Sequence, residues 1–279
     1  MQSDQSKNDF PKVTLTAADG ALAELYLYGA QVTSWRPADG DERLFLSERA
    51  EFSAGKAIRG GVPVCFPQFA GVGPLLKHGF ARLSIWKLLG VEQIGDSAQA
   101  ILQLEDSAAT RAIWPHAFRA TLTVTVAGSL LRLEFKVQNT GATPFTFTAA
   151  LHSYLQVHDI SKTVVENLGN SRYWDAVTGD LDNTQLAPEL RFNGEVDRVY
   201  GQVPVPVVVH EPGRRMTVLA TGFPDVVLWN PGAKKCAALS DIEPAGYRRM
   251  LCVEAAVINE PPELQAGESW CGAQELRAS

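Results

Sequence analysis

The sequence predicts an all-β protein, because three observations agree. Apolar and polar residues alternate with a two-residue period through much of the chain, which is the repeat of strands rather than helices. Only one segment, EDSAATRAIWP at 105–115, has a convincing helical pattern. Two alternating runs are joined by a short turn of hairpin type. Many short strands in antiparallel array imply a large sandwich of sheets.

The hairpin is the clearest element. In 121–126, leucine and valine share one face with threonines opposite, and 131–138 alternates in the same way. The residues Ala127-Gly128-Ser129 supply the turn between them. Further strands are expected at 22–28, 31–35, 83–90, 99–104, 145–157, 203–209, 216–220, 225–229, 249–257 and 270–276.

In the helical segment, Asp106 or Ser107 can cap the first turn, and Pro115 ends the helix. The chain contains no linker, internal repeat or low-complexity tract. We therefore expect a single domain over residues 1–279, with residues 1–10 flexible.

Composition excludes several classes of function. The formal net charge is −6, the pI is about 5.4, and the basic residues are scattered, so nucleic acid is not an expected partner. The N-terminus MQSDQSKNDFPK has no apolar core, and no run of about 18 apolar residues follows, so we expect neither a secretion signal nor a membrane span. The expected protein is cytoplasmic and monomeric.

The four cysteines form no CxxC pair and no close cluster. This spacing argues against a zinc site and against a disulfide framework. We expect buried thiols at Cys65, Cys236, Cys252 and Cys271.

A histidine interrupts the plain alternation of TAALHSYLQVHD, residues 148–159. With period two, His152 lies on the polar face of the expected strand, which is either solvent-exposed or part of a site. His158 follows six residues later, roughly 20 Å along a continuous strand, so one metal ion cannot bind both histidines. A metal site is therefore disfavoured.

Glu254 is the second unusual residue, because it follows an apolar run in RRMLCVEAAV, residues 248–257. It shares its face with Met250, Cys252 and Ala256. The structural explanation is an ion pair or an edge position, and the functional one is a partly desolvated general base. A histidine and a glutamate on separate strands can face one cleft as an acid and base pair.

The segment 58–82, IRGGVPVCFPQFAGVGPLLKHGFAR, is rich in glycine and proline. It matches neither the dinucleotide fingerprint nor the phosphate loop. Arg59 and Arg82 bracket it, and their planar donors suit a phosphate, while Gly60 and Gly61 allow a close approach of the backbone. The alternative is a pair of surface ion pairs around a long connection.

Several motifs occur in an order that resembles one family. They are YGAQVTSW, RGGVPVCFPQF, HGFAR, LHSYL, FNGEVDRVY at 192–200, VVLWNP at 226–231 and DIEPAGYRRMLCVEAA at 241–256. Together they resemble the hexose-6-phosphate mutarotases, or glucose-6-phosphate 1-epimerases, of the aldose 1-epimerase superfamily. This resemblance implies a galactose-mutarotase-like β-supersandwich with a sugar phosphate in a cleft on one sheet face. It also implies no metal and no organic cofactor.

The resemblance assigns catalytic roles to the two unusual residues. His152 of LHSYL matches the general acid, and Glu254 of CVEAA matches the general base. Opening a sugar ring requires that the anomeric hydroxyl lose a proton while the ring oxygen gains one, so one base and one acid are needed. The implied reaction interconverts the α and β anomers of a hexose 6-phosphate, with glucose 6-phosphate as the expected substrate.

Five further residues are implied to bind the substrate. Arg59 and Arg82 match arginines suited to the 6-phosphate, Asp197 matches a carboxylate for sugar hydroxyls, and His78 lines the cleft near the anomeric end. Lys77 replaces a glutamine of some members and would add to phosphate binding. The sequence NPG at 230–232 replaces the commoner NPW and removes an aromatic surface.

Two other functions remain open. One is a non-catalytic carbohydrate-binding or sensor protein on the same fold, which His152 and Glu254 argue against. The other is an aldose 1-epimerase for unphosphorylated hexoses, which Arg59 and Arg82 argue against.

Overall fold

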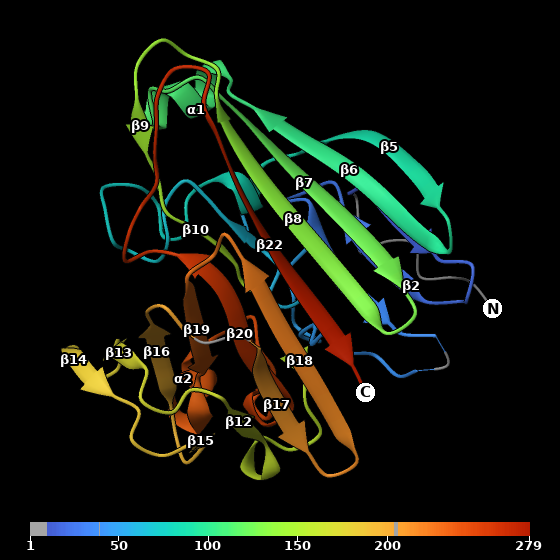
Figure 1. Ribbon diagram of the computed structural model, residues 1–279, viewed down its shortest axis with the longest axis vertical. Coiled ribbons are helices and arrows are strands. Elements are labelled where there is room, and N and C mark those ends of the chain that lie inside the picture. Colours follow the sequence, from blue (N-terminus) through green and yellow to red (C-terminus); the bar gives the residue numbers. More distant parts are fainter. Residues whose placement is uncertain (1–9, 39, 204–205) are drawn as a thin grey trace.

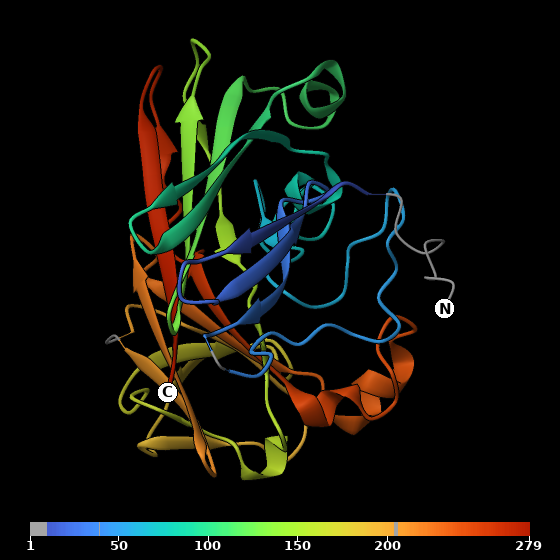
Figure 2. The ribbon, with the colours of Figure 1, turned by 90° about the vertical axis from the view of Figure 1, so that its right-hand side faces the viewer.

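The computed structural model describes residues 10–38, 40–203 and 206–279. Two large sheets, of nine and eight strands, pack face to face around one hydrophobic core (Figure 1, Figure 2). The predicted all-β fold class is confirmed. Residues 1–9 of the segment expected to be flexible lie outside the described residues. In the described part of the chain, no helix has the length and apolar character needed to cross a membrane.

The nine-stranded sheet contains the predicted hairpin. Its strands are β5 (Lys87–Ile94), β6 (Ser97–Glu105), β7 (Phe118–Ala127), β8 (Leu130–Asn139), β12 (Val164–Glu166), β15 (Glu189–Arg191), β17 (Val207–Glu211), β18 (Arg214–Thr221) and β22 (Ser269–Ala278). The order is β15-β12-β17-β18-β22-β8-β7-β6-β5. Val126 pairs with Leu131 across the hairpin, and both are buried in the core. This confirms that the apolar residues of the two strands share one buried face.

The eight-stranded sheet carries the conspicuous residues of the sequence. Its strands are β4 (Val64–Cys65), β10 (Ala149–Leu151), β11 (Tyr154–Gln156), β13 (Arg172–Asp175), β14 (Asp180–Thr184), β16 (Val196–Tyr200), β19 (Asp225–Asn230) and β20 (Met250–Val257). The order is β14-β13-β16-β19-β20-β10-β4, and β11 also pairs with β20.

The remaining elements are small. They are β1 (Lys12–Thr16), β2 (Leu22–Tyr26) and β3 (Gln31–Arg36) in one sheet, β9 (Phe145–Thr146) and β21 (Glu263–Leu264) in another, the helices α1 (Ala108–Ile113) and α2 (Gly232–Ala238), and the 3-10 turns η1 (Ala81–Leu83), η2 (Ile160–Lys162) and η3 (Gly246–Arg249). The predicted helix is α1, and Ser107 rather than Asp106 caps it, since the Ser107 hydroxyl accepts from the Thr110 amide.

The expected continuous strand at 145–157 was wrong, because the chain forms β9, β10 and β11 with breaks between them. At the second break, the His152 amide donates to the Pro63 carbonyl and the Ser153 amide turns back to Leu151. The expected strand at 83–90 begins only at Lys87, because η1 occupies its start. The helix α2 was not predicted.

The alternation of faces survives the break at His152. Leu151 pairs with Ala255 and Tyr154 pairs with Cys252, so the register with β20 is the same on both sides. This register places His152 opposite Glu254. Because opposite residues of antiparallel strands project from one face of the sheet, the two side chains are neighbours.

Strand β20 is buried on both faces along its whole length, which explains its uninterrupted apolar sequence. Leu251 and Val253 belong to the main core between the sheets. Cys252 packs in a smaller cluster on the opposite face, the face that also carries Glu254. The carboxyl group is therefore a buried group on a covered sheet face, not an edge residue.

A buried glutamine connects the two sheets directly behind this region. Gln274 of β22 is completely buried; its side-chain oxygen accepts from the Ser153 hydroxyl, and its amide nitrogen donates to the Val253 carbonyl at 3.0 Å. Ser153 and Val253 are the chain neighbours of His152 and Glu254. The bridge thus holds both strands next to these residues.

We expect Gln274→Leu to lower the free energy of unfolding by about 2–4 kcal/mol, because it leaves a buried hydroxyl and a buried carbonyl without their partner. Urea unfolding followed by circular dichroism measures this change. Gln103→Leu, on the half-buried side of β6, should change stability by no more than about 0.5 kcal/mol. Equal stability of the Gln274 variant and the parent protein would contradict a structural role for the bridge.

Candidate active site

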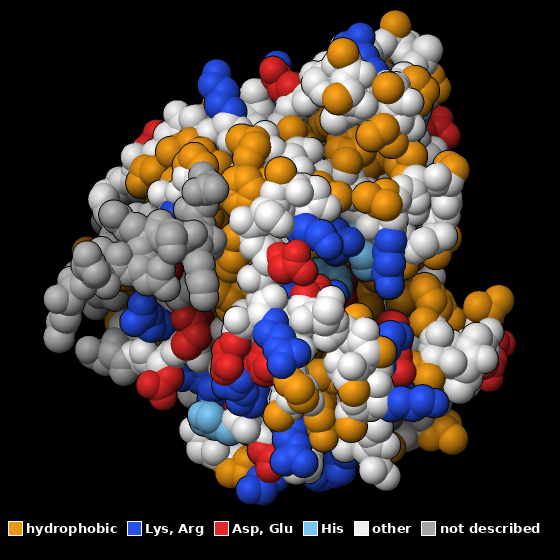
Figure 3. Space-filling view, turned by 180° about the vertical axis from the view of Figure 1, so that it is seen from behind, with side chains coloured by type: hydrophobic (Ala, Val, Ile, Leu, Met, Phe, Trp, Pro, Cys, Tyr) orange, Lys and Arg blue, Asp and Glu red, His pale blue; other side chains and the backbone are white. Residues whose placement is uncertain are grey.

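All seven residues implied to act on the substrate line one pocket of about 160 Å³ on the outer face of the eight-stranded sheet. They are Arg59, Lys77, His78, Arg82, His152, Asp197 and Glu254. Figure 3 shows a hollow near the centre of this face, with histidine, basic and acidic side chains around it. The sequence therefore identified groups that the fold brings together from distant segments.

Strand pairing explains how three elements direct side chains into the pocket. Trp229 of β19 pairs with Cys252 of β20 on one side and with Asp197 of β16 on the other. Val227 pairs with Glu254. Residues paired in this way share one face, so the sheet itself forms the pocket floor.

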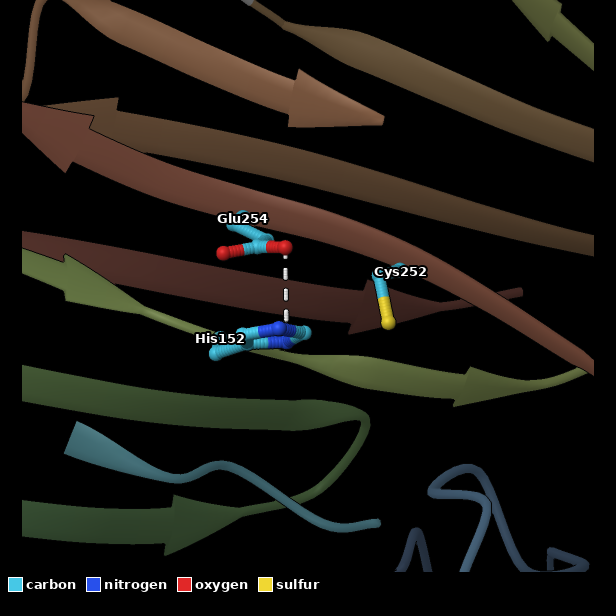
Figure 4. A group of neighbouring side chains, drawn as sticks. All are labelled: His152, Cys252 and Glu254. Carbon is cyan, nitrogen blue, oxygen red and sulfur yellow. Dashed lines mark ion pairs between the residues drawn. The ribbon is translucent and has the colours of Figure 1, made fainter. Parts of the chain in front are cut away.

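His152 and Glu254 form the centre of the floor (Figure 4), where His152 Nδ1 lies 3.3 Å from Glu254 Oε1. The exposed fractions are only 6% for His152 and 1% for Glu254, in contrast to the solvent-exposed face that was one expectation for His152. The imidazole stacks on the Tyr154 ring at 4.7 Å between centroids. His152 Nδ1 and Glu254 Oε2 have no hydrogen-bond partner in the part of the chain that the structure describes.

Burial opposes charge on both members of this pair. Burial first, and the nearby Asp197 second, raise the pKa of Glu254 well above its usual range. Burial, followed by His78 and Arg82, lowers the pKa of His152 well below its usual range. Both shifts favour the uncharged forms of the two groups over the expected imidazolium and carboxylate. The neutral pair and the charged pair carry the same number of protons and no net charge.

His78 is held in a defined state by its surroundings. Its Nδ1 accepts from the Ala70 amide at 3.2 Å and lies 3.2 Å from the Cys65 thiol. Burial, with Arg82 and Lys77 nearby, lowers its pKa to about 2, so the ring is neutral. Since Nδ1 is an acceptor, Nε2 carries the hydrogen and is a donor.

The guanidinium of Arg59 is engaged by protein groups. It pairs with Asp241 at 2.9 Å through one terminal nitrogen and donates to the Tyr154 hydroxyl at 2.9 Å through the other. The phenol of Tyr154 also stacks against His152. Arg59 therefore orients the ring that supports the imidazole.

Lys77 and Arg82 differ from Arg59 because they form no ion pair with the described residues. Arg82 donates one bond to the Lys77 carbonyl, and its Nε has no hydrogen-bond partner. Among the residues that the structure describes, no carboxylate pairs with either side chain at ion-pair distance. The pocket thus has two cations that form no ion pair with a carboxylate of the described residues.

Asp197 lies beside this positive charge. Burial raises its pKa to about 6, and Lys235 and Lys77 partly oppose that increase. Lys235, from α2, pairs with Glu195 at 2.5 Å. Near neutral pH Asp197 is therefore mostly ionised and can accept hydrogen bonds from hydroxyl groups.

The glycines of the segment 58–82 serve the fold more than a ligand. A Cβ atom at Gly61 would lie 2.0 Å from the Val32 carbonyl oxygen, and one at Gly79 would lie 2.2 Å from the Phe66 oxygen. Both residues have positive φ angles. The close approach expected at Gly60 and Gly61 is thus an approach to neighbouring backbone of the same protein.

Sequence reasoning missed part of the pocket lining. The additional lining residues are Phe69, Ala70, Val227, Trp229, Lys235 and Leu239. Trp229 lies in the motif VVLWNP and was an available signal. Gly232, which replaces a tryptophan of that motif, has a φ of +60°, and a Cβ there would lie 2.7 Å from the Glu195 amide nitrogen. Lys235 could not be placed because α2 was not predicted.

The thiols and histidines differ from the expectations in two respects. Cys65, Cys236 and Cys252 are buried, but Cys271 is exposed because it pairs with Lys136 on the outer face of the nine-stranded sheet. His152, Cys252 and Glu254 place ligand-type atoms within 4.8 Å of one another. The spacing argument considered two histidines on one strand and did not detect this cluster. His158 lies outside it, with its side chain 63% exposed.

A second cavity, of about 630 Å³, lies farther along the same sheet face. It is lined by Trp174 and Val199, among others, and contains none of the seven implied residues. Val199 pairs with both Trp174 and Val227, so one row of the sheet connects this cavity to Glu254. The smaller pocket is the candidate active site because all seven implied residues, including His152 and Glu254, line it.

Comparisons with known proteins agree with this geometry. The chain matches the family model described as aldose 1-epimerase over residues 11–277. It is 39% identical over 277 residues to a protein of Cenchrus ciliaris named "Putative glucose-6-phosphate 1-epimerase", covering 96% of this chain and 84% of the relative. A protein of Escherichia coli (strain K12) with the same name is 33% identical over 262 residues, which are 92% and 87% of the two chains.

Solved structures of mutarotase-like proteins also match this chain. A Salmonella typhimurium protein whose crystal structure is described as a "putative mutarotase" superposes with a TM-score of 0.90 at 30% identity, covering 97% of this chain and 91% of the other. A galactose mutarotase related enzyme from Lactobacillus acidophilus has a TM-score of 0.75 at 16% identity, over 96% and 97% of the two chains, and shares the fold. Because the family model matches nearly the whole of this chain, the chain belongs to the aldose 1-epimerase family.

Proposed function

We propose that this protein interconverts the α and β anomers of a hexose 6-phosphate, with glucose 6-phosphate as the expected substrate. One observation carries the proposal: a buried histidine and glutamate 3.3 Å apart share a small pocket with two cations that no carboxylate among the described residues neutralises. The pair suits proton transfer to and from a sugar, and the cations suit a phosphate. The names of the relatives support this substrate class.

Ring opening needs one proton to leave the anomeric hydroxyl and one to reach the ring oxygen. We assign Glu254 as the base and His152 as the acid, as the family resemblance implies. The aldehyde then rotates about its bond to C2, and the reverse transfers close the ring with the other configuration. The number of protons on the enzyme is the same before and after the reaction, so no cosubstrate is consumed.

The resting pair must first acquire charge. Transfer of a proton from Glu254 to His152 Nδ1, which lies 3.3 Å from Oε1, would give a carboxylate and an imidazolium without any exchange with solvent. A bound phosphate dianion favours the imidazolium, because a nearby negative charge raises the pKa of a histidine. Since His152 Nδ1 faces Glu254, the other ring nitrogen, Nε2, is the donor we assign to the ring oxygen.

Three groups would orient the sugar between the acid and the base. The Nε2–H of His78 donates to a sugar oxygen, the Asp197 carboxylate accepts from a hydroxyl, and the Trp229 ring supplies an aromatic wall. Holding both reacting oxygens in register with the pair adds a proximity contribution to the rate.

For the phosphate, the contacts favour Lys77 and Arg82 over Arg59. The donors of Arg59 are already directed at Asp241 and Tyr154, whereas Arg82 keeps Nε without a partner. We therefore assign the phosphate to Lys77 and Arg82, and we assign Arg59 to the support of Tyr154 and His152. This assignment differs from the family resemblance, which implies a phosphate-binding role for both arginines.

Measurement of anomer exchange by NMR tests the proposed function. Freshly dissolved glucose, galactose and their 6-phosphates are compared with and without the protein. We expect acceleration for the 6-phosphates far above that for the free sugars. Binding without acceleration would favour the carbohydrate-binding alternative, and equal acceleration of free and phosphorylated sugars would favour an epimerase of unphosphorylated hexoses.

The first prediction concerns the pair. His152→Asn and Glu254→Gln preserve size and polarity but remove proton transfer, so each should reduce exchange of the sugar phosphate by roughly 100-fold or more. Both variants should still bind it, as measured by calorimetry. His158→Asn is the matched control, since that exposed histidine lies outside the pocket, and it should keep full activity. Near-normal exchange in either pocket variant would refute the mechanism.

The second prediction concerns the phosphate. Arg82→Gln should weaken the phosphorylated substrate by roughly 10- to 100-fold, the effect of about 1.5–3 kcal/mol for a lost charged hydrogen bond, and should barely affect residual activity on free glucose. Lys77→Ala should act in the same direction. Lys136→Ala, on the exposed face of β8, serves as the control for general loss of positive charge. An equal fall in kcat/KM for glucose 6-phosphate and for free glucose would argue against the phosphate assignment.

The third prediction concerns pH. Since the pKa of Asp197 is raised to about 6, its carboxylate form is lost as the pH falls through 6, and kcat/KM should fall with it. In Asp197→Asn the contribution of Asp197 to this limb should disappear, while activity above pH 7 is lower throughout. The substrate phosphate also ionises near pH 6, so the difference between the two profiles isolates Asp197. Asp180→Asn, at an exposed position, should retain the parent profile.

A further inference from the structure

We propose that the floor of the pocket is a binding site for Zn²⁺ or a cation of similar softness, with His152, Cys252 and Glu254 as ligands, and that an occupied site is inhibited. The inhibition rests on the proposed function, but the binding does not. The site would not be that of a resident cofactor. It follows from the placement of Cys252 beside the acid and base pair.

Strand geometry creates the cluster. Cys252 and Glu254 are two residues apart on β20 and therefore project from one face, while His152 lies opposite Glu254. Figure 4 shows the three side chains converging from the two strands. Their ligand atoms all lie within 4.8 Å of one another, and His152 Nδ1 and Glu254 Oε1 are 3.3 Å apart.

These spacings are close to those of a zinc site. With Zn–N and Zn–O near 2.1 Å and Zn–S near 2.3 Å, tetrahedral coordination needs ligand atoms roughly 3.4–3.6 Å apart. The histidine and carboxylate already meet this requirement. The thiol sulfur lies within 4.8 Å of the other ligand atoms and has to approach them by no more than about 1.2 Å.

The buried polar atoms also lack other partners. His152 Nδ1 and Glu254 Oε2 accept or donate no hydrogen bond within the described ranges, although both residues are more than nine-tenths buried. Unpaired buried polar atoms are costly, and a cation would satisfy them together. The fourth position would face the pocket and hold water.

The ligand set selects the metal. Thiolate and imidazole favour zinc and cadmium over magnesium and calcium, which prefer oxygen. Binding releases the thiol proton and the proton of the pair to solvent, so that the cation meets a thiolate, a neutral imidazole and a carboxylate. Arg59, Lys77 and Arg82 line the same pocket and repel a cation, so we expect weaker binding than at structural zinc sites.

Inhibition follows because the metal would use the atoms that transfer protons. A zinc-bound Glu254 cannot accept the anomeric proton, and a zinc-bound His152 Nδ1 cannot take up a proton from Glu254. The hexose 6-phosphate and the metal should therefore exclude each other from the floor of the pocket.

Cadmium binding followed by ultraviolet absorption tests the site without any need for turnover. The parent protein should develop a thiolate-to-metal charge-transfer band, and Cys252→Ser should lose it. Cys271→Ser, which removes the exposed thiol, should retain the band and is the matched control. A band that persists in Cys252→Ser but disappears in Cys271→Ser would overturn the proposal. If Cys252→Ser does not fold, Glu254→Gln is used instead. Loss of one of the three ligands should weaken cadmium binding at least tenfold. An unchanged affinity for cadmium would refute the site.

Inhibition is measured in parallel by titrating zinc chloride into the anomer-exchange assay and reversing it with a chelator. Zinc should inhibit the parent and Cys271→Ser alike, and at least tenfold more zinc should be needed for Cys252→Ser. Equal inhibition of all three proteins, or none of any, would overturn the proposal. A cadmium band in a protein without mutarotase activity would refute the proposed function and leave the metal site standing.

Discussion

The spacing of the two chain segments that carry His152 and Glu254 depends on the buried amide of Gln274. It bonds to Ser153 and Val253, the neighbours of His152 and Glu254, from the opposite sheet. The amide therefore acts behind the floor of the pocket, where water cannot replace it. On the other side, Arg59 fixes Tyr154 and through it the imidazole plane. The pair is thus supported from both faces of the sheet.

This rigid support allows an unusual electrostatic arrangement. The floor disfavours charge on His152 and Glu254, while Lys77 and Arg82 at the same pocket lack carboxylate partners in the described chain. Under the proposed function, an anionic substrate would neutralise the cations and favour an imidazolium nearby. The chemical step would then be coupled to binding of a part of the substrate that does not react.

The sequence predicted the fold class because strand periodicity is a local pattern, and the family resemblance named seven residues that the fold gathers in one pocket. Period-two alternation revealed the hairpin, and Glu254 was conspicuous in an apolar strand. The break at His152 was not predictable, because it depends on a hydrogen bond to Pro63, far away in the chain. Three further features also depend on tertiary contacts. The donors of Arg59 are occupied, burial disfavours charge on His152 and Glu254, and Cys252 lies beside them. Lys235 was missed because α2 is short and begins at a glycine.

The origin of the pocket from distant segments has a consequence for folding. Its residues extend from Arg59 to Glu254, and the floor requires β16, β19, β20 and the segment around His152 to be paired in register. Contacts so distant in sequence form slowly and late, since loop closure precedes any gain from pairing. Enzymatic activity during refolding should therefore return with the last cooperative step, after most secondary structure is present. Under the proposed function, turnover would therefore report that the strands of the pocket floor are correctly paired.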